Sequence, residues 1–452
     1  MTAQAESLWL ANPAACWTGS AQDASGGVVV KGSRITEVLA ASERPRGRVD
    51  RRLDVAGLVL TPGLINTHHH FYQTLTRALP AAQNKALFAW LGALYPIWAN
   101  MDAECIVAAT ELALAELLLS GCTTAADHHY LFADGFADAI DLQVAAARRI
   151  GMRVTLTRGS MSLGQSEGGL PPDHVTQSLE TILADSERVI DRHHDAGHDA
   201  MVQIALAPCS PFSVSADLMR ETAQLARERG VRLHTHLAET EDENAFCIAE
   251  FGLRPLPYLE SLGWLEDDVW LAHGIHFTAD EIRRIGAAGA SVCHCPTSNM
   301  LLASGVCPAL DLEAAGAPIA LGVDGSASND HSNLMQEVRQ AFLLQRLRYG
   351  CDRVGIDDAL RWATAGGAAA LGRDGLGKIV VGALADLALF DLEELRFSGV
   401  GDPVTALLTC GASRARHVMV NGRWRVRDSE LCGLDEAALR ARHESASRRL
   451  RG

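Results

Sequence analysis

The chain has 452 residues, of which 48% are hydrophobic and 21% are charged, so it holds ample material for a folded core. Its 55 acidic residues outnumber its 40 basic ones, and the formal net charge is −15. This charge argues against a nucleic-acid-binding protein and against a protein that binds anionic membranes, because both classes present basic patches.

Eleven cysteines are scattered along the chain, and no two of them form a CxxC pair. This pattern indicates neither a zinc ribbon nor a thioredoxin-type site and favours reduced, buried thiols. Residues 1–19 lack the basic segment and long apolar core of a signal peptide. No apolar run approaches the ~20 residues that span a bilayer. We therefore expect a soluble, cytoplasmic protein with no membrane partner.

Short strands are predicted at both ends of the chain. Residues 27–32 and 34–39 are rich in β-branched side chains and predict a hairpin that turns at Gly32-Ser33. The same texture returns near the C-terminus in three short apolar runs between glycine turns, 377–382, 385–391 and 417–426. We infer that the two ends pair into one small β domain, with two unrelated terminal hairpins as the alternative.

Residues 57–65 form an apolar run that fits a buried strand and leads into His68-His69-His70. Side chains alternate along a strand, so His68 and His70 would point one way and His69 the other. Two imidazoles on one face at the mouth of a strand would form half of a metal site. The plainer interpretation is that they make hydrogen bonds in a loop.

From this run to residue 324, strand-like and helix-like segments alternate. Seven more strand-like segments follow, at 121–126, 153–158, 202–207, 231–236, 269–273, 291–294 and 318–324. Eight such units predict a parallel sheet closed into a (β/α)8 TIM-type barrel, in the α/β class. A doubly wound open sheet is the competing architecture, but no GxGxxG loop follows any strand.

The predicted division of the chain has three parts. Residues 1–60 and 376–452 would together form the small β-sandwich domain, and residues 61–375 would form the catalytic barrel. The chain ends would thus meet beside a barrel inserted between them.

Polar side chains gather at the ends of the predicted strands: His68, His70, His236, His273, His294 with Asn299, and Asp324. In a closed barrel these positions converge at one face, where active sites are built. Three imidazoles and one carboxylate suit Zn²⁺, which takes nitrogen and oxygen ligands and keeps a position open for water when catalytic. Taken singly, His236 fits a core histidine, Glu239 a solvated acid and Asp324 a helix N-cap. Taken together, they favour a metal site.

Four motifs at these strand ends resemble the amidohydrolase superfamily, and the match spans nearly the whole chain. They are Pro62-Gly-Leu-Ile-Asn-Thr-His68-His-His70, His234-Thr-His236-Leu-Ala-Glu239-Thr, Leu271-Ala-His273-Gly and Val323-Asp324-Gly. The resemblance implies one Zn²⁺ per chain, with Fe²⁺ as the alternative, bound by His68, His70, His236 and Asp324. No lysine closes the fourth strand, where binuclear members carry a carboxylated one. Chains of this kind often associate, so a homo-oligomer is expected.

The resemblance further implies a hydrolytic deaminase that acts on an amino-substituted purine or triazine ring. Zinc lowers the pKa of a bound water to about 7 and so provides hydroxide at neutral pH. Glu239 would protonate the ring nitrogen and then the leaving ammonia. His273 would orient the hydroxide and stabilise its charge, and Asp324 could also accept the proton of the water.

Three residues are candidates for substrate contacts: Gln73, Trp90 and Cys209. Gln73 could offer a donor and an acceptor to the edge of a base, and related base deaminases carry Gln there. Nucleoside-acting relatives tend to have Glu before a Trp-Leu pair and His after a strand-end proline, where this chain has Ala89 and Cys209. Both differences favour a free aromatic base over a nucleoside.

The segment 69–80, with its neighbours 88–91 and 94–98, most resembles superfamily members that convert 8-oxoguanine to urate. The closest competing substrates are hydroxylated s-triazines of the hydroxydechloroatrazine kind, followed by guanine or adenosine. Guanine is disfavoured because His236-Leu-Ala-Glu239 replaces the usual His-x-Ser-Glu. A hydantoin-type cyclic amide and a metal-free binding protein on the same fold remain as further alternatives.

Overall fold

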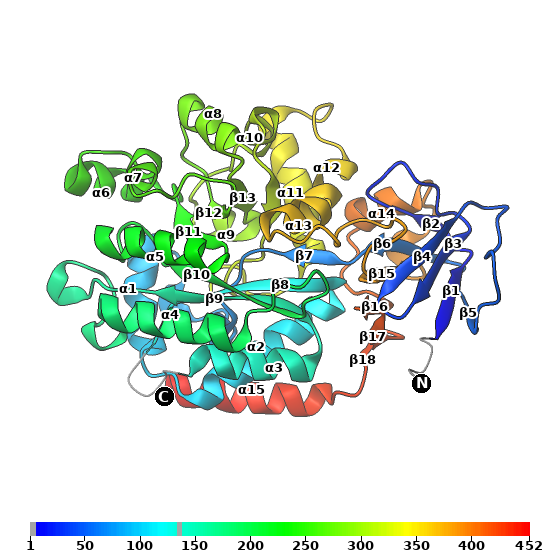
Figure 1. Cartoon of the computed structure of the whole chain (residues 1–452), viewed down its shortest axis with the longest axis horizontal. Helices are drawn as coiled ribbons and strands as arrows, with labels where there is room; N and C mark the ends of the chain where they lie inside the picture. The colour runs from blue at the N-terminus through cyan, green and yellow to red at the C-terminus, as the bar shows by residue number, and fades with distance from the viewer. Residues whose placement is uncertain (1–5, 133–137) are drawn as a thin grey trace.

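The computed structural model describes residues 6–132 and 138–452, so residues 1–5 of the predicted N-terminal part lie outside the described residues. Eight parallel strands form the central sheet, in the order β14-β13-β12-β11-β10-β9-β8-β7 (Figure 1). They are β7 (Leu64–Asn66), β8 (Cys122–His129), β9 (Arg153–Ser160), β10 (Val202–Pro208), β11 (Leu233–Leu237), β12 (Val269–His273), β13 (Ser291–His294) and β14 (Ile319–Leu321). The predicted barrel fold is confirmed.

The barrel closes between its first and last strands. Thr67 N donates to Leu321 O at 3.0 Å, and Asp324 N donates to His68 O at 3.1 Å. These two bonds join the segment after β7 to the segment after β14. They therefore bring His68 and Asp324, 256 residues apart in sequence, to the same rim of the barrel.

Helices surround the barrel strands (Figure 1). They are α1 (Leu87–Trp98), α2 (Ala103–Leu119), α3 (Ala139–Ile150), α4 (Leu179–His193), α5 (Ala216–Arg229), α6 (Glu241–Phe251), α7 (Pro255–Ser261), α8 (Ala279–Ala288), α9 (Pro296–Leu301), α10 (Ala309–Ala315), α11 (Leu334–Tyr349), α12 (Ile356–Arg361) and α13 (Gly367–Ala370). Helix α5 illustrates the local rules: the Ser215 side chain caps its N-terminus, and Gly230 ends it with a φ of +65°. Its buried Leu218 and Met219 provide the apolar side that such helices pack onto a sheet.

The apolar run predicted as one strand is two strands in different sheets. Strand β6 (Leu58–Pro62) belongs to the small β domain, and β7 belongs to the barrel. Gly63 lies at the break, where an added Cβ would sit 2.2 Å from the Thr123 side chain. The three histidines follow β7 in a connecting segment rather than on a strand. His69 still points elsewhere, since its Nε2 lies 2.9 Å from Ser332 Oγ.

The small β domain consists of a four-stranded and a six-stranded sheet. The first has the order β4-β3-β1-β5, from β1 (Ser7–Ala11), β3 (Gly27–Lys31), β4 (Arg34–Leu39) and β5 (Arg51–Asp54). The second has the order β18-β17-β16-β15-β6-β2, from β2 (Ala15–Cys16), β15 (Leu387–Asp391), β16 (His417–Val420), β17 (Arg423–Arg427) and β18 (Glu430–Leu431). Because β6 and β15 pair antiparallel, the two chain ends share one sheet, as the sequence predicted.

The strand predicted at 377–382 is wrong, because this segment turns instead of pairing. Gly377 and Gly382 have φ values of +78° and +91°, which interrupt an extended strand. Between them Ile379 is fully buried and donates its N–H to Thr18 O at 2.9 Å. The apolar run therefore fills the core of the small domain without joining a sheet.

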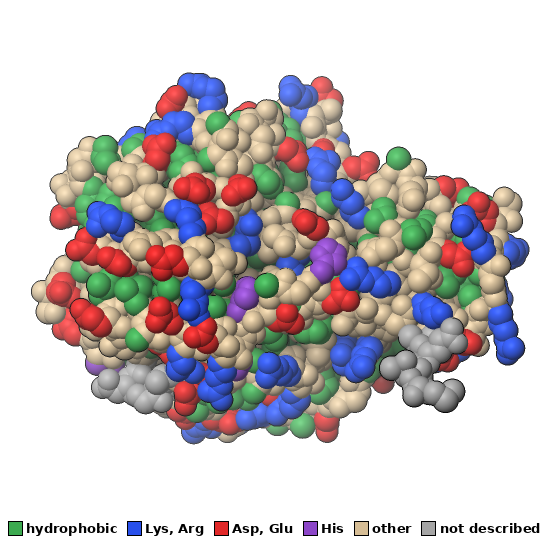
Figure 2. Space-filling view, in the orientation of Figure 1, with side chains coloured by type: hydrophobic (Ala, Val, Ile, Leu, Met, Phe, Trp, Pro, Cys, Tyr) green, Lys and Arg blue, Asp and Glu red, His purple; other side chains and the backbone are tan. Residues whose placement is uncertain are grey.

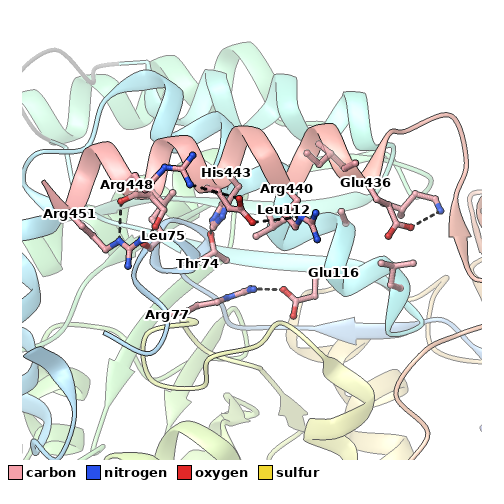
Figure 3. A pocket seen from close by; sticks show the side chains of 17 residues that line it. Thr74, Leu75, Arg77, Leu112, Glu116, Glu436, Arg440, His443, Arg448 and Arg451 are labelled. Carbon is pink, nitrogen blue, oxygen red and sulfur yellow. Dashed lines mark hydrogen bonds and ion pairs between the residues drawn. The ribbon is translucent and has the colours of Figure 1, made fainter. Parts of the chain in front are cut away.

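Two helices lie in the C-terminal range predicted for the small β domain, α14 (Pro403–Thr409) and α15 (Glu436–Arg451). Helix α15 packs along the barrel side, against α2 and the 3₁₀ segment η1 (Phe71–Thr76) (Figure 1). Side chains of α15 line a cavity of about 730 Å³ together with Thr74, Leu75, Arg77 and Glu116. Figure 3 shows these residues beside α15. The exact boundaries of the predicted domains remain a prediction.

Acidic and basic side chains are mixed over the face shown in Figure 2. Such a mixed surface differs from the basic stripe expected of a nucleic-acid-binding protein. Within residues 6–132 and 138–452, no helix is long and apolar enough to cross a membrane.

Candidate active site

Four side chains from three strand ends meet at one rim of the barrel. His70 Nε2 lies 3.2 Å from His236 Nε2, and both His68 Nε2 and His70 Nε2 lie 3.3 Å from Asp324 Oδ1. All four side chains are at most 9% exposed. The barrel thus brings together the four residues predicted as metal ligands.

The tautomers of the three histidines follow from their second nitrogens. His70 Nδ1 lies 2.7 Å from His128 O, and His236 Nδ1 lies 2.6 Å from Cys209 O. A carbonyl oxygen only accepts, so each Nδ1 carries the proton and each Nε2 keeps a lone pair. Burial lowers the pKa of His236 well below its usual range, which keeps this ring neutral.

His68 reaches the same state through a relay. His234 Nδ1 donates to Trp270 O at 2.7 Å, so the Nε2 of the neutral His234 accepts from His68 Nδ1 at 2.8 Å. Burial lowers the pKa of His68 and of His234 well below the usual range. The Nε2 atom of His68 therefore also offers a lone pair, and it is buried without a hydrogen-bond partner among the described residues.

Three imidazole lone pairs and a carboxylate that point at one place repel one another unless a cation lies between them. The residues present therefore fit a metal ion with nitrogen and oxygen ligands, such as zinc. Two groups of three buried side chains have ligand atoms within 4.8 Å of one another: His68 with His128 and His236, and His68 with His273 and Asp324. Of the four ligands predicted from sequence, His68 is in both groups, His236 and Asp324 are in one each, and His70 is in neither.

Glu239 and His273 lie beside this cluster. His273 Nε2 is 3.5 Å from Glu239 Oε2 and 3.9 Å from Asp324 Oδ2, and His273 Nδ1 is 2.9 Å from Asn299 Oδ1. Burial raises the pKa of Glu239 above its usual value, although His273 opposes this shift. Burial opposes protonation of His273, but Glu239 and Asp324 outweigh it and raise the pKa of the ring. The separation of 3.5 Å places the two side chains where a proton can be shared between them.

Left-handed backbone marks three of these strand ends. Ala238, His273 and Asp324 have φ values of +53°, +70° and +60°. Such conformations are costly for residues other than glycine and persist where the surroundings fix them, which is common at functional sites. They turn the chain sharply at the point where each functional side chain faces the rim.

The three predicted substrate-contact residues line the same cavity, with His70, Glu239 and Asp324. Ala327 holds two of them, because its N–H lies 3.4 Å from Gln73 Oε1 and its carbonyl accepts from Trp90 Nε1 at 3.3 Å. Gly325 permits this approach, since an added Cβ would lie 1.9 Å from Gln73 Oε1. Cys209 is 3% exposed and its Sγ lies 4.0 Å from His236 Nδ1.

The cavity itself is narrow, with a free volume of about 30 Å³. Leu87, Trp90, Leu91 and Tyr95 of α1 line one side of it, together with Phe212 and Leu302 from other elements. Ligand sites usually measure about 300 Å³ or more. The free volume in this structure is smaller than that of such a site, and α1 carries four of the residues that line it.

Sequence reasoning assigned no role to His234, His128 or the carboxyl of Asp127. His234 sits two residues before His236, and the two-residue period of a strand could have placed both on one face. No sequence pattern around His128 and Cys209 indicates that their carbonyls orient the rings of His70 and His236. His294, counted in the predicted cluster, faces away and lies 3.2 Å from Gln345 Nε2.

The chain is similar in sequence to a known protein family and to several characterised enzymes. The profile of the amidohydrolase family matches residues 59–425. The chain is 59% identical over 439 residues to 8-oxoguanine deaminase of Pseudomonas aeruginosa, covering 97% of this chain and 98% of that one. It is 40% identical to hydroxydechloroatrazine ethylaminohydrolase of Pseudomonas sp. strain ADP, over 87% of this chain and 83% of that one.

Among solved structures, atrazine chlorohydrolase of Arthrobacter aurescens TC1 in complex with zinc superposes with a TM-score of 0.91. That structure is 30% identical and the match covers 97% of this chain and all of that one. A zinc-bound adenosine deaminase of Xanthomonas campestris has a TM-score of 0.84 at 29% identity, over 99% of each chain.

Proposed function

The chain belongs to the amidohydrolase family, and we propose that it is a zinc-dependent aminohydrolase that converts 8-oxoguanine and water to urate and ammonia. The convergence of three histidine Nε2 atoms on Asp324, beside the Glu239–His273 pair, is the observation that carries the reaction type. The substrate follows from the likeness to the Pseudomonas aeruginosa enzyme over nearly the full length of both chains.

In this proposal His68, His70, His236 and Asp324 would hold one zinc ion per chain. When bound, zinc would lower the pKa of a water and supply hydroxide near neutral pH. Glu239, whose raised pKa lets it keep a proton in a buried setting, would protonate the ring nitrogen and then the leaving amino group. His273 would donate a hydrogen bond to the attacking oxygen, and Asp324 would accept the proton of the water.

The remaining cavity residues would hold the base. Gln73 presents an amide, which can both donate to and accept from the edge of a purine. Trp90 would contact a face or edge of the ring, and Cys209 occupies the place where a larger histidine is expected in nucleoside-acting relatives.

A substrate panel tests the proposal directly. Ammonia release should be measured with 8-oxoguanine, guanine, isocytosine, adenosine and a hydroxylated triazine, together with the ultraviolet absorbance of urate. We expect the highest kcat/KM for 8-oxoguanine. A preference for the triazine would favour the second candidate function, which the 40% identity to the hydroxydechloroatrazine enzyme supports. A preference for adenosine would contradict the argument from Ala89 and Cys209.

The metal site has a test of its own. Elemental analysis should find one zinc ion per chain, and His236→Ala should lower that occupancy because one of four ligands is lost. His294→Gln is the matched control, since this buried histidine lies outside the ligand group and contacts Gln345. Full zinc occupancy in His236→Ala would contradict the ligand assignment.

Two further features are proposed with this function, a homo-oligomeric state and a cytoplasmic location. Exposed apolar side chains on α9 and α11, which pack together, offer a surface for association: Met300, Leu301, Leu343 and Leu347. The free cysteines suit a reducing compartment. Sedimentation at the mass of a single 48.3 kDa chain would contradict the oligomer.

A further inference from the structure

A second buried acid, Glu243, holds the backbone at the end of β11. Ala238 N donates to Glu243 Oε1 at 2.9 Å, and Glu239 N donates to Glu243 Oε2 at 2.8 Å. Glu243 is completely buried. Hydrogen bonds to a carboxylate are about twice as strong as those between neutral groups. Both oxygens of Glu243 are thus used to fix the residue pair that includes the proposed acid.

The local backbone explains why a carboxylate is needed here. Ala238 has a left-handed φ of +53°, which costs free energy for any residue with a Cβ. Successive N–H groups around such a residue point to one side and form a concave site for an anion. Glu243 fills this site from within the chain, so it stabilises the turn that presents the Glu239 side chain.

The position of Glu243 in its helix departs from the usual pattern. Thr240 caps α6 by accepting from Glu243 N at 3.3 Å, and the side chain of a third-position Glu ordinarily turns back to the cap N–H. Thr278 and Glu281 make that ordinary capping box in α8. In α6 the carboxylate instead reaches past the cap to residues 238 and 239.

The turn after β12 holds the other side of the same backbone. Ala238 O accepts from the N–H groups of Ile275 and His276, each at 2.9 Å, and Leu237 O accepts from Gly274 N at 3.1 Å. His273 immediately precedes this turn. The backbone of Glu239 is therefore clamped between the start of α6 and the segment that carries its partner His273.

We propose that Glu243 is a positioning residue for the deamination, which fixes the Glu239 carboxyl against His273 through two backbone N–H groups. This inference rests on the proposed function, because it takes Glu239 as the acid. A misplacement of about 1 Å in such a group can cost about 100-fold in rate. Metal binding and substrate affinity should stay, because the histidine rings and Gln73 are held by other contacts.

The test compares two substitutions with a matched control. Glu243→Gln keeps the shape but turns one acceptor into a donor, and Glu243→Asp keeps the charge but withdraws it by one carbon–carbon bond. We expect kcat to fall about 10- to 100-fold in both, with KM and zinc content unchanged. Glu281→Gln removes an equally placed buried carboxylate that bonds Thr278 N and Arg254, and it should keep kcat. Unchanged kcat per zinc in Glu243→Asp would overturn the proposal.

A double-substitution cycle separates positioning from general damage. In a Glu239→Gln background, adding Glu243→Gln should lower the remaining rate by less than about twofold, since both act through one group. An equal fold-loss of rate in both backgrounds would overturn the proposal.

If Glu239→Gln has no measurable rate, a crystal structure of Glu243→Asp decides the question. A displaced Glu239 carboxyl supports the proposal, and an unmoved one refutes it. If the wild type does not deaminate 8-oxoguanine, the proposed function fails, and the same variants are measured on the preferred base.

Discussion

For single residues in this barrel, the hydrogen bonds of each histidine ring decide which nitrogen carries the proton and which keeps a lone pair. The backbone carbonyls of His128 and Cys209 accept hydrogen bonds from the Nδ1–H groups of His70 and His236, so each Nε2 keeps a lone pair that could bind a metal. The same reasoning separates Glu239 from an ordinary surface acid, since it is 4% exposed and its pKa is raised by burial. Chemistry at this scale depends on what surrounds a residue more than on its type.

The first prediction concerns Glu239→Gln. The amide keeps the size of the side chain but cannot deliver a proton, so kcat should fall about 10²- to 10⁴-fold. Zinc content should remain at the wild-type level, because the substituted group is outside the proposed ligand set. Steady-state ammonia release and elemental analysis check both points. Glu250→Gln, an exposed position on α6, serves as control and should be fully active.

A second prediction concerns Asp127, whose carboxylate accepts from Phe71 N and from Gln143 Nε2, each at 2.6 Å. Burial raises its pKa from 3.8 to about 7. Between these values the folded protein binds more protons than the unfolded chain, so stability falls as the pH rises from about 4 to 7. This loss amounts to at most about 4 kcal/mol.

Asp127→Asn should remove this dependence, because a neutral amide keeps the bond to Phe71 N and a rotated Gln143 amide can accept from the new Nδ2 group. Urea unfolding of the two proteins at pH 4, 5, 6 and 7 measures the difference. We expect the stability of the variant relative to wild type to rise along this series. Parallel pH profiles for the two proteins would refute the prediction.

At the scale of elements, short segments of the rim are held by helices from distant parts of the chain. On α15, His443 Nε2 lies 3.0 Å from Thr74 Oγ1, and Ser447 Oγ donates to Leu75 O at 2.6 Å (Figure 3). Both contacts are made to η1, which also contains Gln73, the residue directly before Thr74. Helix α15 thus supports the part of the rim that is proposed to read the base.

The third prediction is that the double variant His443→Ala/Ser447→Ala has a KM for the base raised about 3- to 10-fold, because a less ordered η1 must be fixed on binding. Zinc content and kcat should change little, since Glu239 and His273 lie on other elements. Arg448→Ala, whose exposed side chain pairs with Glu444, is the control. An unchanged KM in the double variant would show that α15 does not support substrate binding.

For the whole molecule, the junction between barrel and small β domain contains a buried ion pair. Arg153 at the start of β9 bonds both oxygens of Asp386, at 3.1 and 3.2 Å, and Asn421 N donates to the same carboxylate at 2.7 Å. The Arg153 and Asp386 side chains are at most 2% exposed. This contact links strands of the barrel to the sheet that both chain ends share.

The fourth prediction is that Asp386→Ala lowers the free energy of unfolding by about 3–5 kcal/mol, because it leaves the Arg153 charge buried without its partner. Urea unfolding measures the loss. The ion pair Asp217–Arg220 is largely exposed, so Asp217→Ala should leave stability almost unchanged. If Asp386→Ala lowers the free energy of unfolding as little as Asp217→Ala does, the junction pair adds nothing to stability.

Much of the fold could be predicted from the sequence because its signals are local. Alternating strand and helix patterns give the order of the barrel, and β-branched runs at both ends give the small β domain. Where neighbours override local preference, prediction failed. Gly63 divides one apolar run between two sheets, and residues 377–382 fill a core as a turn.

The residue types at the strand ends follow from the sequence alone, since histidine and aspartate after apolar runs can be recognised without coordinates. Their convergence, the relay from Trp270 through His234 to His68, and the clamp of Glu243 on Ala238 and Glu239 were decided by the tertiary structure. The physical reason is that hydrogen bonds and charges act over a few ångströms in space. Barrel closure sets those distances between residues that lie up to 256 positions apart.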